Sequence, residues 1–385
     1  MRRLADRVFA VGVNDNKRRL FDALIPLPHG TSYNSYLIAG EKTAVIDASD
    51  PLFADEWLKN IRETGYKPDY IIANHAEQDH SGALGDFVRE YPEAKIVASA
   101  KGRDFLKLLL HLPVEKFVLV EDRGTLDLGG GFVLEFYFAP WVHWPETMFT
   151  FLPAAKILFS CDFLGAHYAS ADLYVTDEAE IYLAAKRYYA EIMMPFRAQS
   201  RKALELAKKL DPRIVAPSHG QAYNRPEFIF DAYADWTSEE TKNALILYVS
   251  MHGSVQKMTG IIRRVLEAQG AAARALDLAD ADLGEVAMEL VDARAALIGA
   301  PTVLGGAHPA ALYAAALLNA LRPKTRYIGL YGSCLWGGKA LEQLAGLLSN
   351  IKPEILPSFL VKGLPSAADE DKLVLWAKDV AAKVN

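Results

Sequence analysis

The sequence predicts an α/β protein with two consecutive domains, residues 1–243 and residues 244–385. Two observations predict this class. Short apolar segments alternate with segments of helical apolar spacing along the whole chain. The pattern also changes near residue 243, where hairpins give way to a regular strand–helix alternation. A length of 385 residues agrees, because it suits about two domains.

The first domain is expected to be a layered α/β fold. Residues 35–47 read as a hairpin, because apolar runs flank a Gly-Glu-Lys turn. Further strands or hairpins are expected at 8–25, 70–73, 95–99, 117–120, 131–138, 147–160 and 213–216, and helices at 53–64, 101–110, 178–193, 197–210 and 226–242.

The second domain begins with a continuous apolar run at 244–251. Five strands with intervening helices predict a doubly wound, parallel sheet. The later strands are expected at 275–278, 295–299, 326–330 and 354–361, and the helices at 256–269, 283–288, 309–321, 340–348 and 367–384.

Composition excludes several classes of protein. The net charge of -6 gives no basic surface for nucleic acid. The two cysteines, Cys161 and Cys334, are far apart, which argues against a disulfide framework or a built-in iron–sulfur or rubredoxin module. No signal peptide is visible, and the apolar helix at 310–321 is too short to span a bilayer. A soluble, cytoplasmic protein without a membrane or nucleic-acid partner is expected.

Residues 74–82 read NHAEQDHSG and follow a buried strand. Four of their side chains bind metals in proteins: His75, Glu77, Asp79 and His80. Side chains at i, i+2 and i+4 can converge from a tight loop, but not from a helix, where i and i+2 point to different sides. A metal site in a loop is therefore expected here. The alternative is a polar loop with surface histidines.

Three more residues of this kind end predicted strands of the first domain: His143, Asp162 and His219. Because strand ends in a layered fold line one edge, these residues are expected to meet His75 despite a separation of ~145 positions in sequence. Imidazole combined with carboxylate favours iron or manganese, whereas all-imidazole or thiolate sets favour zinc.

Three loops at strand ends of the second domain predict a flavin mononucleotide (FMN) site. The loop 250–255 leads into a helix, whose N-terminus can hold a phosphate, and it lacks the lysine of a nucleoside triphosphate loop. Glycines in 299–306 and 331–338 allow a flat ring to approach, and Trp336 is expected to cover its face. The candidate residues are Ser250, Met251, His252, Gly253, Ser254, Val255, Pro301, Thr302, Leu304, Gly305, Gly306, Ser333, Cys334, Leu335, Trp336 and Gly337.

Over essentially its whole length the chain resembles the flavodiiron proteins (A-type flavoproteins). The motif HxExDH at 75–80, His143 in His-Trp-Pro-Glu, Asp162 in Cys-Asp-Phe and His219 in Pro-Ser-His-Gly all match that family. The resemblance implies an αββα metallo-β-lactamase-like sandwich followed by a five-stranded flavodoxin-like domain. It implies two iron ions and FMN as cofactors.

The resemblance also implies roles for these residues. His75, Glu77 and His143 would hold one iron, and Asp79 and His219 the other, with Asp162 bridging. His80 would be displaced and act from behind the ligands, and Trp144 and His167 are further candidates near the site. Val255, Leu304-Gly305 and Cys334-Leu335 depart from the family pattern, which concerns the hydrogen bonds and redox potential of the flavin.

Family members reduce dioxygen to water, nitric oxide to nitrous oxide, or both. The resemblance implies a head-to-tail homodimer, or a dimer of dimers, in which the flavin of one subunit faces the irons of the other. Electrons are expected from an external donor, either rubredoxin or a reduced deazaflavin. The sequence does not choose between the two gases or between the two donors.

Two other functions compete with this one. A zinc-dependent hydrolase of the metallo-β-lactamase fold would typically carry an imidazole where this chain has Glu77, and needs no flavin domain. An electron carrier using flavin alone would be expected to lack metal ligands, whereas all six are present.

Overall fold

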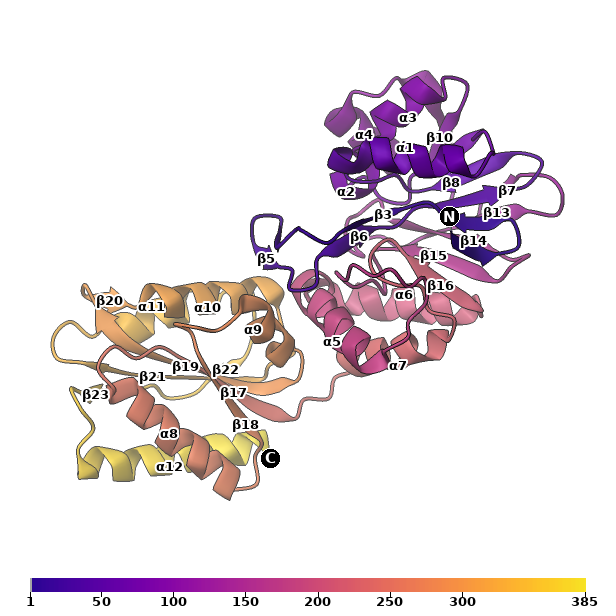
Figure 1. The fold of residues 1–385 in the computed structure, drawn as a ribbon. Coiled ribbons are helices and arrows are strands. Elements are labelled where there is room, and N and C mark those ends of the chain that lie inside the picture. The colour runs from indigo at the N-terminus through magenta and orange to yellow at the C-terminus, as the bar shows by residue number, and fades with distance from the viewer. Residues whose placement is uncertain (1) are drawn as a thin grey trace. The chain divides into compact units, whose positions relative to one another are not determined.

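The computed structural model describes residues 2–385, which form two compact units divided between Thr237 and Ser238 (Figure 1). The first unit ends with helix α7 (Pro226–Thr237), which is five residues shorter than the predicted helix 226–242. Asn243, at the sequence-based boundary, begins β17, the first strand of the second unit.

The first unit contains a seven-stranded sheet in the order β1-β2-β7-β8-β9-β10-β11. Strands β8 to β11 run parallel because helices connect them, whereas β1, β2, β7 and β8 pair antiparallel. The strands are β1 (Arg2–Ala5), β2 (Val8–Ala10), β7 (Tyr36–Ala39), β8 (Thr43–Ile46), β9 (Tyr70–Ile72), β10 (Lys95–Ala98) and β11 (Phe117–Leu119), and the helices are α1 (Ala54–Glu63), α2 (Gln78–Ser81), α3 (Leu84–Glu90) and α4 (Ala100–Leu110).

A second sheet of this unit has five strands in sequence order. They are β12 (Thr125–Asp127), β13 (Val133–Phe138), β14 (Met148–Leu152), β15 (Ile157–Cys161) and β16 (Ile214–Pro217). Between β15 and β16 lie α5 (Glu178–Tyr188), a wider helical turn (Tyr189–Met193), a short 3-10 turn (Met194–Phe196) and α6 (Arg197–Lys209). The predicted helix 178–193 therefore changes pitch after Tyr188.

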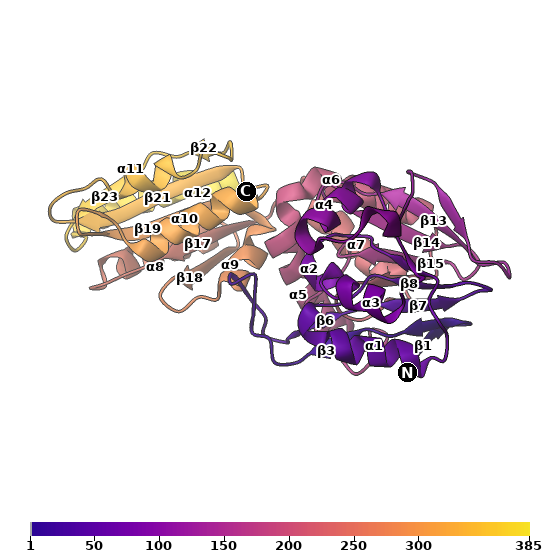
Figure 2. The same ribbon diagram turned by 90° about the horizontal axis from the view of Figure 1, so that it is seen from above.

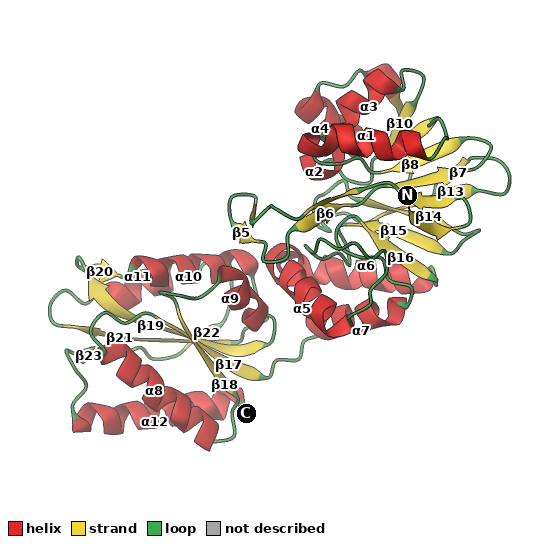
Figure 3. Ribbon diagram, in the orientation of Figure 1, coloured by secondary structure: helices red, strands yellow, loops and turns green. Residues whose placement is uncertain are grey.

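Alternation along the strands of the first sheet separates two cores. Val45 and Ile71 pack on Trp57 of α1 and its neighbours, whereas Ile46 and Ile72 pack against residues of the second sheet such as Phe136. Successive strand residues face opposite sides of a sheet. A strand that is apolar on both faces is therefore buried between the helices on one side and the second sheet on the other. Helices α1–α4 cover one sheet and α5–α7 the other, which gives the αββα sandwich (Figure 3).

Two short hairpin-like pairs complete the unit. Strand β3 (Val13–Asp15) pairs with β6 (Thr31–Tyr33), and β4 (Leu20–Phe21) pairs with β5 (Ile25–Pro26). The sequence prediction of a strand and turn at 8–25 covers β2, β3, β4 and the first residue of β5.

The second unit is the predicted doubly wound sheet, with the order β18-β17-β19-β21-β22 (Figure 2). Helices α9, α10 and α11 cover one face, and α8 and α12 the other (Figure 1). Its strands are β17 (Asn243–Tyr248), β18 (Ala273–Asp277), β19 (Ala293–Val303), β20 (Gly306–Ala307), β21 (Tyr327–Cys334), β22 (Glu354–Ile355) and β23 (Phe359–Lys362), and its helices are α8 (Ser254–Ala268), α9 (Leu283–Leu290), α10 (Pro309–Leu321), α11 (Ala340–Gly346) and α12 (Ala367–Val384).

The predicted strand 354–361 is divided. Strands β22 and β23 both pair with β21, but Pro357 lies between them and has no N–H to donate to the ladder. Within residues 2–385, no helix has the length and apolarity to cross a membrane.

Candidate metal centre and ligand groove

Seven side chains from the strand ends of both sheets of the first unit meet at one place. We call these seven residues the metal centre. His75 and Glu77 lie between β9 and α2, Asp79 and His80 in α2, His143 between β13 and β14, Asp162 directly after β15, and His219 shortly after β16.

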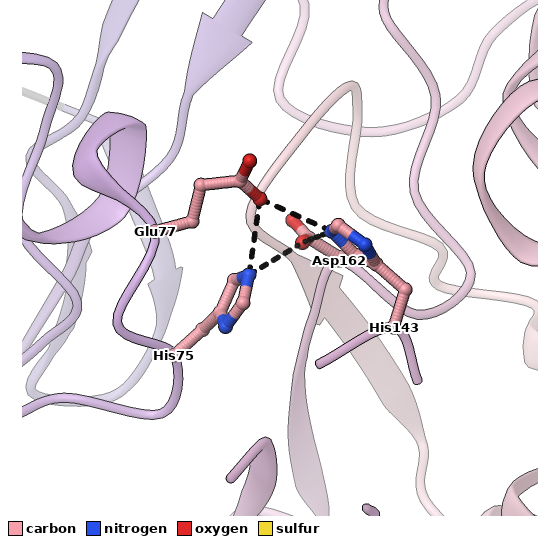
Figure 4. A group of neighbouring side chains, drawn as sticks. All are labelled: His75, Glu77, His143 and Asp162. Atoms are coloured by element: carbon pink, nitrogen blue, oxygen red, sulfur yellow. Dashed lines mark hydrogen bonds and ion pairs between the residues drawn. The ribbon is translucent and has the colours of Figure 1, made fainter. Parts of the chain in front are cut away.

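The first group of the metal centre is His75, Glu77, His143 and Asp162 (Figure 4). Oε2 of Glu77 lies 3.1 Å from Nε2 of His75 and 3.1 Å from Nε2 of His143. Oδ2 of Asp162 lies 3.2 Å from Nε2 of His143 and 3.5 Å from Nε2 of His75. One ligand atom from each residue therefore faces a common point.

The second group is Asp79, His80 and His219. Oδ2 of Asp79 lies 3.1 Å from Nε2 of His219 and 3.2 Å from Nε2 of His80. The other oxygen of Asp162, Oδ1, lies 2.8 Å from His80 Nε2 and 3.5 Å from His219 Nε2. Asp162 thus turns one oxygen toward each group, as a bridging carboxylate would.

The structure corrects one expectation about residues 75–80. Gln78–Ser81 form a helical turn rather than a continuous loop, so Asp79 and His80 are neighbours on α2. In this structure Nε2 of His80 lies within the second group, and its displacement from the ligands stays a prediction.

The residues present fit metal cations. Both carboxylate oxygens of Asp79 and Oδ1 of Asp162 are buried but accept no well-oriented hydrogen bond from any described residue. Buried polar atoms without partners are rare and call for an ion or water. Ligand atoms at about 2.1 Å from one ion lie about 3.0–3.4 Å apart, which agrees with the contacts in each group.

Hydrogen bonds from behind fix two of the imidazoles. Nδ1 of His75 lies 2.7 Å from Oε1 of the buried Glu146, which also accepts from the Ala76 N–H at 3.0 Å. Nδ1 of His219 donates to the Ser32 carbonyl at 2.6 Å. These bonds leave Nε2 free to bind a metal. Nδ1 of His80 has no such partner within the described residues.

Glu146 has a supporting role that the sequence analysis missed. Its signal was its place three residues after His143 in His-Trp-Pro-Glu. A second buried carboxylate, Asp47, accepts hydrogen bonds from Asn74 N at 2.8 Å and Ser218 Oγ at 3.3 Å. Asp47 thereby ties together the two loops that carry His75 and His219.

The two further candidates lie beside the ligands. The Trp144 ring stands edge-on to His75 with centroids 5.0 Å apart. His167 is buried, and its Nδ1 is 2.9 Å from Thr31 Oγ1 while its ring lies 4.7 Å from that of His219. Burial and the neighbouring His219 hold the pKa of His167 well below its usual value, so it is a neutral imidazole.

Without metal, the pKa shifts in the metal centre favour ion pairs between its histidines and its carboxylates. Burial would lower the pKa of His80, but Asp79 and Asp162 raise it to about 9. Burial would likewise lower the pKa of His143, but Asp162 and Glu77 raise it to about 9. Burial would raise the pKa of Asp162, yet His80 and His143 hold it well below its usual value. A metal ion must therefore displace imidazolium protons to bind.

The second unit carries a groove of 470 Å³ at the carboxyl ends of its parallel strands. This is where doubly wound sheets bind ligands. Thirteen residues line the groove, which we call the ligand groove: Ser250, Met251, His252, Ser254, Val255, Pro301, Thr302, Ser333, Cys334, Leu335, Trp336, Gly363 and Leu364.

Several features of the ligand groove fit FMN. Helix α8 begins after Gly253, which has φ 84° and no side chain. Ser250 Oγ accepts from the Gln256 N–H at 3.2 Å, and the N–H groups of Ser254 and Val255 are available for a phosphate. The buried Thr302 Oγ1 finds no partner within residues 2–385 and can bind a polar ring edge. Trp336 is 69% exposed and can cover an aromatic ring.

Five predicted residues lie outside the lining of the groove. Leu304 and Gly305 form the turn between β19 and β20, with φ of 49° and 84°, and Leu304 is 97% exposed. Gly363 and Leu364 line the groove but were missed, although they follow a predicted strand as the other loops do. The predicted residues outside the lining are Gly253, Leu304, Gly305, Gly306 and Gly337.

Comparison with known proteins gives one consistent family. Residues 31–220 match a family model described as "ODP family beta lactamase". Flavo-diiron protein FprA2 of Clostridium acetobutylicum is 31% identical over 99% of this chain and 99% of its own length. Nitric oxide reductase of Moorella thermoacetica is 31% identical over 99% of this chain and 98% of its own. Rubredoxin oxygen:oxidoreductase of Desulfovibrio gigas has a similar structure, with a TM-score of 0.95, 26% identity and coverage of 99% and 98%.

Proposed function

This chain belongs to the flavodiiron protein family, and from that premise we propose that it reduces dioxygen to water, nitric oxide to nitrous oxide, or both. It is an oxidoreductase with FMN and a non-haem diiron site. The observation that carries the proposal is the position of Asp162, which turns one oxygen toward each of two ligand groups. A zinc hydrolase is not favoured, since Glu77 stands where that class typically has an imidazole.

When bound, two redox-active irons and a flavin together supply the electrons that reduction of a diatomic gas requires. His75, Glu77 and His143 would hold one iron, and Asp79 and His219 the other, with Asp162 shared. His80 points its Nε2 into the second group but lacks a hydrogen bond behind it, so we propose that it is the most readily displaced of the imidazoles.

Residues around the ligands order and shield this site. Glu146 and the Ser32 carbonyl orient His75 and His219. The rings of Phe21 and Tyr188 lie 4.7 and 4.8 Å from His167 and form an apolar wall beside His219. This wall keeps water away from the His219 side of the metal centre. The neutral His167 there offers a ring nitrogen to dioxygen or nitric oxide, which carry no charge.

We further propose that electrons reach the flavin from a separate donor, rubredoxin or a reduced deazaflavin, in the cytoplasm. The two cysteines of these 385 residues cannot form the four-thiolate iron site of rubredoxin. A head-to-tail homodimer, or a dimer of such dimers, would bring the flavin of one subunit to the irons of the other. We also propose that residues 1–243 form the diiron domain and residues 244–385 the FMN-binding domain.

Anaerobic turnover tests the function. The protein with photoreduced flavin is mixed with dioxygen or with nitric oxide, and acceptor consumption and nitrous oxide are measured beside metal content. We expect about two irons per chain and reduction of at least one gas. Active protein with stoichiometric zinc, or no reduction of either gas by iron-loaded protein, would contradict the proposal.

A further inference from the structure

A group of tyrosine and tryptophan side chains from α5, the wider helical turn after it and α7 begins beside the metal centre. The ring of Tyr188, the last residue of α5, lies 5.8 Å from that of the ligand His219 and 4.8 Å from that of His167. The other members of the group extend away from the metal centre. We call these five residues the aromatic row: Tyr188, Tyr189, Tyr233, Trp236 and Tyr182.

The aromatic row continues from Tyr188 to the surface of the first unit. Tyr189 follows Tyr188 directly, so one peptide unit joins the two residues. The ring of Trp236 lies 5.4 Å from that of Tyr189 and 5.3 Å from that of Tyr182, and its Nε1–H donates to Tyr182 Oη at 3.1 Å. Trp236 is buried, whereas Tyr182 is partly exposed. The row therefore leads from a metal ligand to solvent.

A second line of contacts joins the row to Asp162, the residue that faces both ligand groups. Phe163 follows Asp162 directly, and its ring lies edge-on to that of Tyr233 with centroids 5.0 Å apart. The Tyr233 ring in turn lies 5.3 Å from that of Tyr189 and 5.2 Å from that of Trp236. Both lines of contact therefore meet at Trp236.

Packing alone does not account for the residue types in the row. The hydroxyl oxygen of Tyr233 is buried and has no well-oriented hydrogen-bond partner among residues 2–385. A buried polar atom without a partner costs stability, and a phenylalanine would fill the same space without that cost. Tyrosine and tryptophan differ from phenylalanine in that their rings give up one electron readily.

We propose that the aromatic row carries electrons from the surface to the metal centre when reduced flavin runs short, and so protects the ligands from oxidation. This inference rests on the dioxygen reaction of the proposed function. One dioxygen needs four electrons to become two waters, and these normally come from the external donor through FMN. When fewer than four are supplied, dioxygen is the oxidant, and the imidazoles that hold the metals are the groups at risk.

Each event moves one electron and one proton. An electron leaves Tyr188 for the metal centre and is replaced along the row, so that Tyr182 is the residue finally oxidised. The Tyr182 hydroxyl accepts the N–H of Trp236, and its own proton passes to solvent water, which leaves a neutral tyrosyl radical. A small thiol in solution restores the residue: two radicals and two thiols give two tyrosines and one disulfide.

The test looks for this radical under electron shortage. Protein loaded with iron and FMN is given two electrons per chain, mixed with dioxygen without thiol, frozen and examined by electron paramagnetic resonance. A parallel sample of the resting protein receives hydrogen peroxide, so that this reading does not depend on dioxygen reduction. Tyrosine deuterated on the ring identifies a tyrosyl signal. We expect the signal in wild type and its loss in both Tyr182→Phe and Trp236→Phe.

Two matched variants serve as controls. Tyr174→Phe changes another partly exposed tyrosine of the first unit, whose Oη donates to the Leu4 carbonyl at 2.6 Å. Trp57→Phe changes another buried tryptophan, which packs on Phe87 beneath α1. Both controls should keep the wild-type signal. Because Tyr182 is partly exposed, its variant tests the inference even where the core variant Trp236→Phe does not fold.

Mass spectrometry measures the protection itself. After repeated exposure to dioxygen with limiting donor, oxygen added to wild-type peptides should be found mainly at Tyr182. In Trp236→Phe the oxidised positions should shift to His219 and the other ligands, and iron should be lost several-fold faster than from wild type or Trp57→Phe.

Four outcomes would overturn the inference. They are the absence of any radical in wild type, an undiminished tyrosyl signal in Tyr182→Phe, the same signal from iron-free protein, and a radical confined to Trp144, whose ring is 5.0 Å from that of His75. Wild-type protein that reduces neither gas would instead contradict the proposed function. The peroxide sample still reports on the row in that case, so the two failures are distinguishable.

Discussion

The metal centre and the ligand groove are built from different parts of the chain. The metal centre collects side chains from residues 75 to 219, across the ends of two sheets. The ligand groove is a set of loops following adjacent parallel strands of one sheet, and it offers main-chain N–H groups and small residues to a ligand. The first site therefore depends on the identity of each residue, and the second on the path of the backbone.

The departures from the family pattern illustrate this difference. Val255 in the first turn of α8, Leu304 in the turn between β19 and β20, and Cys334 at the end of β21 all belong to the flavin unit. The Val255 side chain is buried in the core and that of Leu304 is almost fully exposed, so neither side chain has to supply a polar atom to the groove. All six predicted ligands of the metal centre, by contrast, are histidine, aspartate or glutamate.

The largest effect is expected from Asp162→Ala, which tests whether the metal centre depends on the identity of a single side chain. Removing a buried carboxylate that faces both ligand groups should abolish iron binding at full occupancy and lower gas reduction about a thousandfold or more. FMN should stay bound, because the groove belongs to the other unit. Iron analysis, flavin absorbance and turnover measure this, with Asp371→Ala, at an exposed aspartate of α12, as control. Full iron and full activity in Asp162→Ala would refute the bridging role.

Glu146 tests whether support from behind matters to the metal centre. Glu146→Ala should weaken metal binding about 10- to 100-fold, because His75 loses the partner that orients its ring. Glu146→Gln, which keeps an acceptor oxygen but not the charge, should fall between this variant and wild type. Metal affinity is measured by competition with a chelator, and the exposed Glu93→Ala serves as control. Equal affinities in all four proteins would show that Glu146 is only a packing residue.

The stability of the first unit should depend on pH differently in the metal-free and in the metal-loaded protein. His80 and His143 have pKa values raised from 6.5 to about 9, so their ion pairs stabilise the metal-free protein below pH 6.5, and that stabilisation is lost as the pH rises through 9. Asp162 has a lowered pKa, so its contribution is present above its unfolded value of 3.8 and lost as the pH falls further. Metal binding releases the imidazole protons, and affinity should rise about tenfold per pH unit for each proton released.

Differential scanning calorimetry measures that effect. The difference in Tm between metal-loaded and metal-free protein should grow from pH 6.5 to pH 9. A constant difference across this window would show that the imidazoles are already neutral in the metal-free protein. The FMN-dependent increment in Tm serves as an internal control, because the ligand groove belongs to the other unit.

The smallest effect is expected from a side chain of the groove. Trp336→Ala should weaken FMN binding about three- to tenfold, because one aromatic contact is lost while the loop N–H groups remain. Fluorescence titration of the flavin measures it, and Leu375→Ala, an exposed apolar residue of α12, is the control. Complete loss of FMN would show that this groove, too, depends on one side chain.

Much of this division could be predicted from sequence. Residues 75–80 identify their chemistry by type and spacing, and His143, Asp162 and His219 follow predicted strands. The helical turn of α2 was not predictable, because it depends on packing between segments far apart in the chain. Glu146 was missed for a similar reason, since its partner His75 is 71 positions away.

The flavin loops were predicted from glycine content, which overestimates contact with a ligand. Leu304-Gly305 supplies left-handed conformations for a turn between two strands rather than for the groove. Gly363 and Leu364 occupy the same kind of strand-end position as the other loops, but the segment has too few glycines to stand out.

Asp162 has a consequence for how the irons enter. Once the first iron binds one oxygen of Asp162, the carboxylate is fixed with its other oxygen toward the second ligand group. The conformational entropy of ordering Asp162 is therefore lost when the first iron binds and not again when the second one does. Loading should then be cooperative, and a sample given half its equivalent of iron should be a mixture of filled and empty molecules with few half-filled ones.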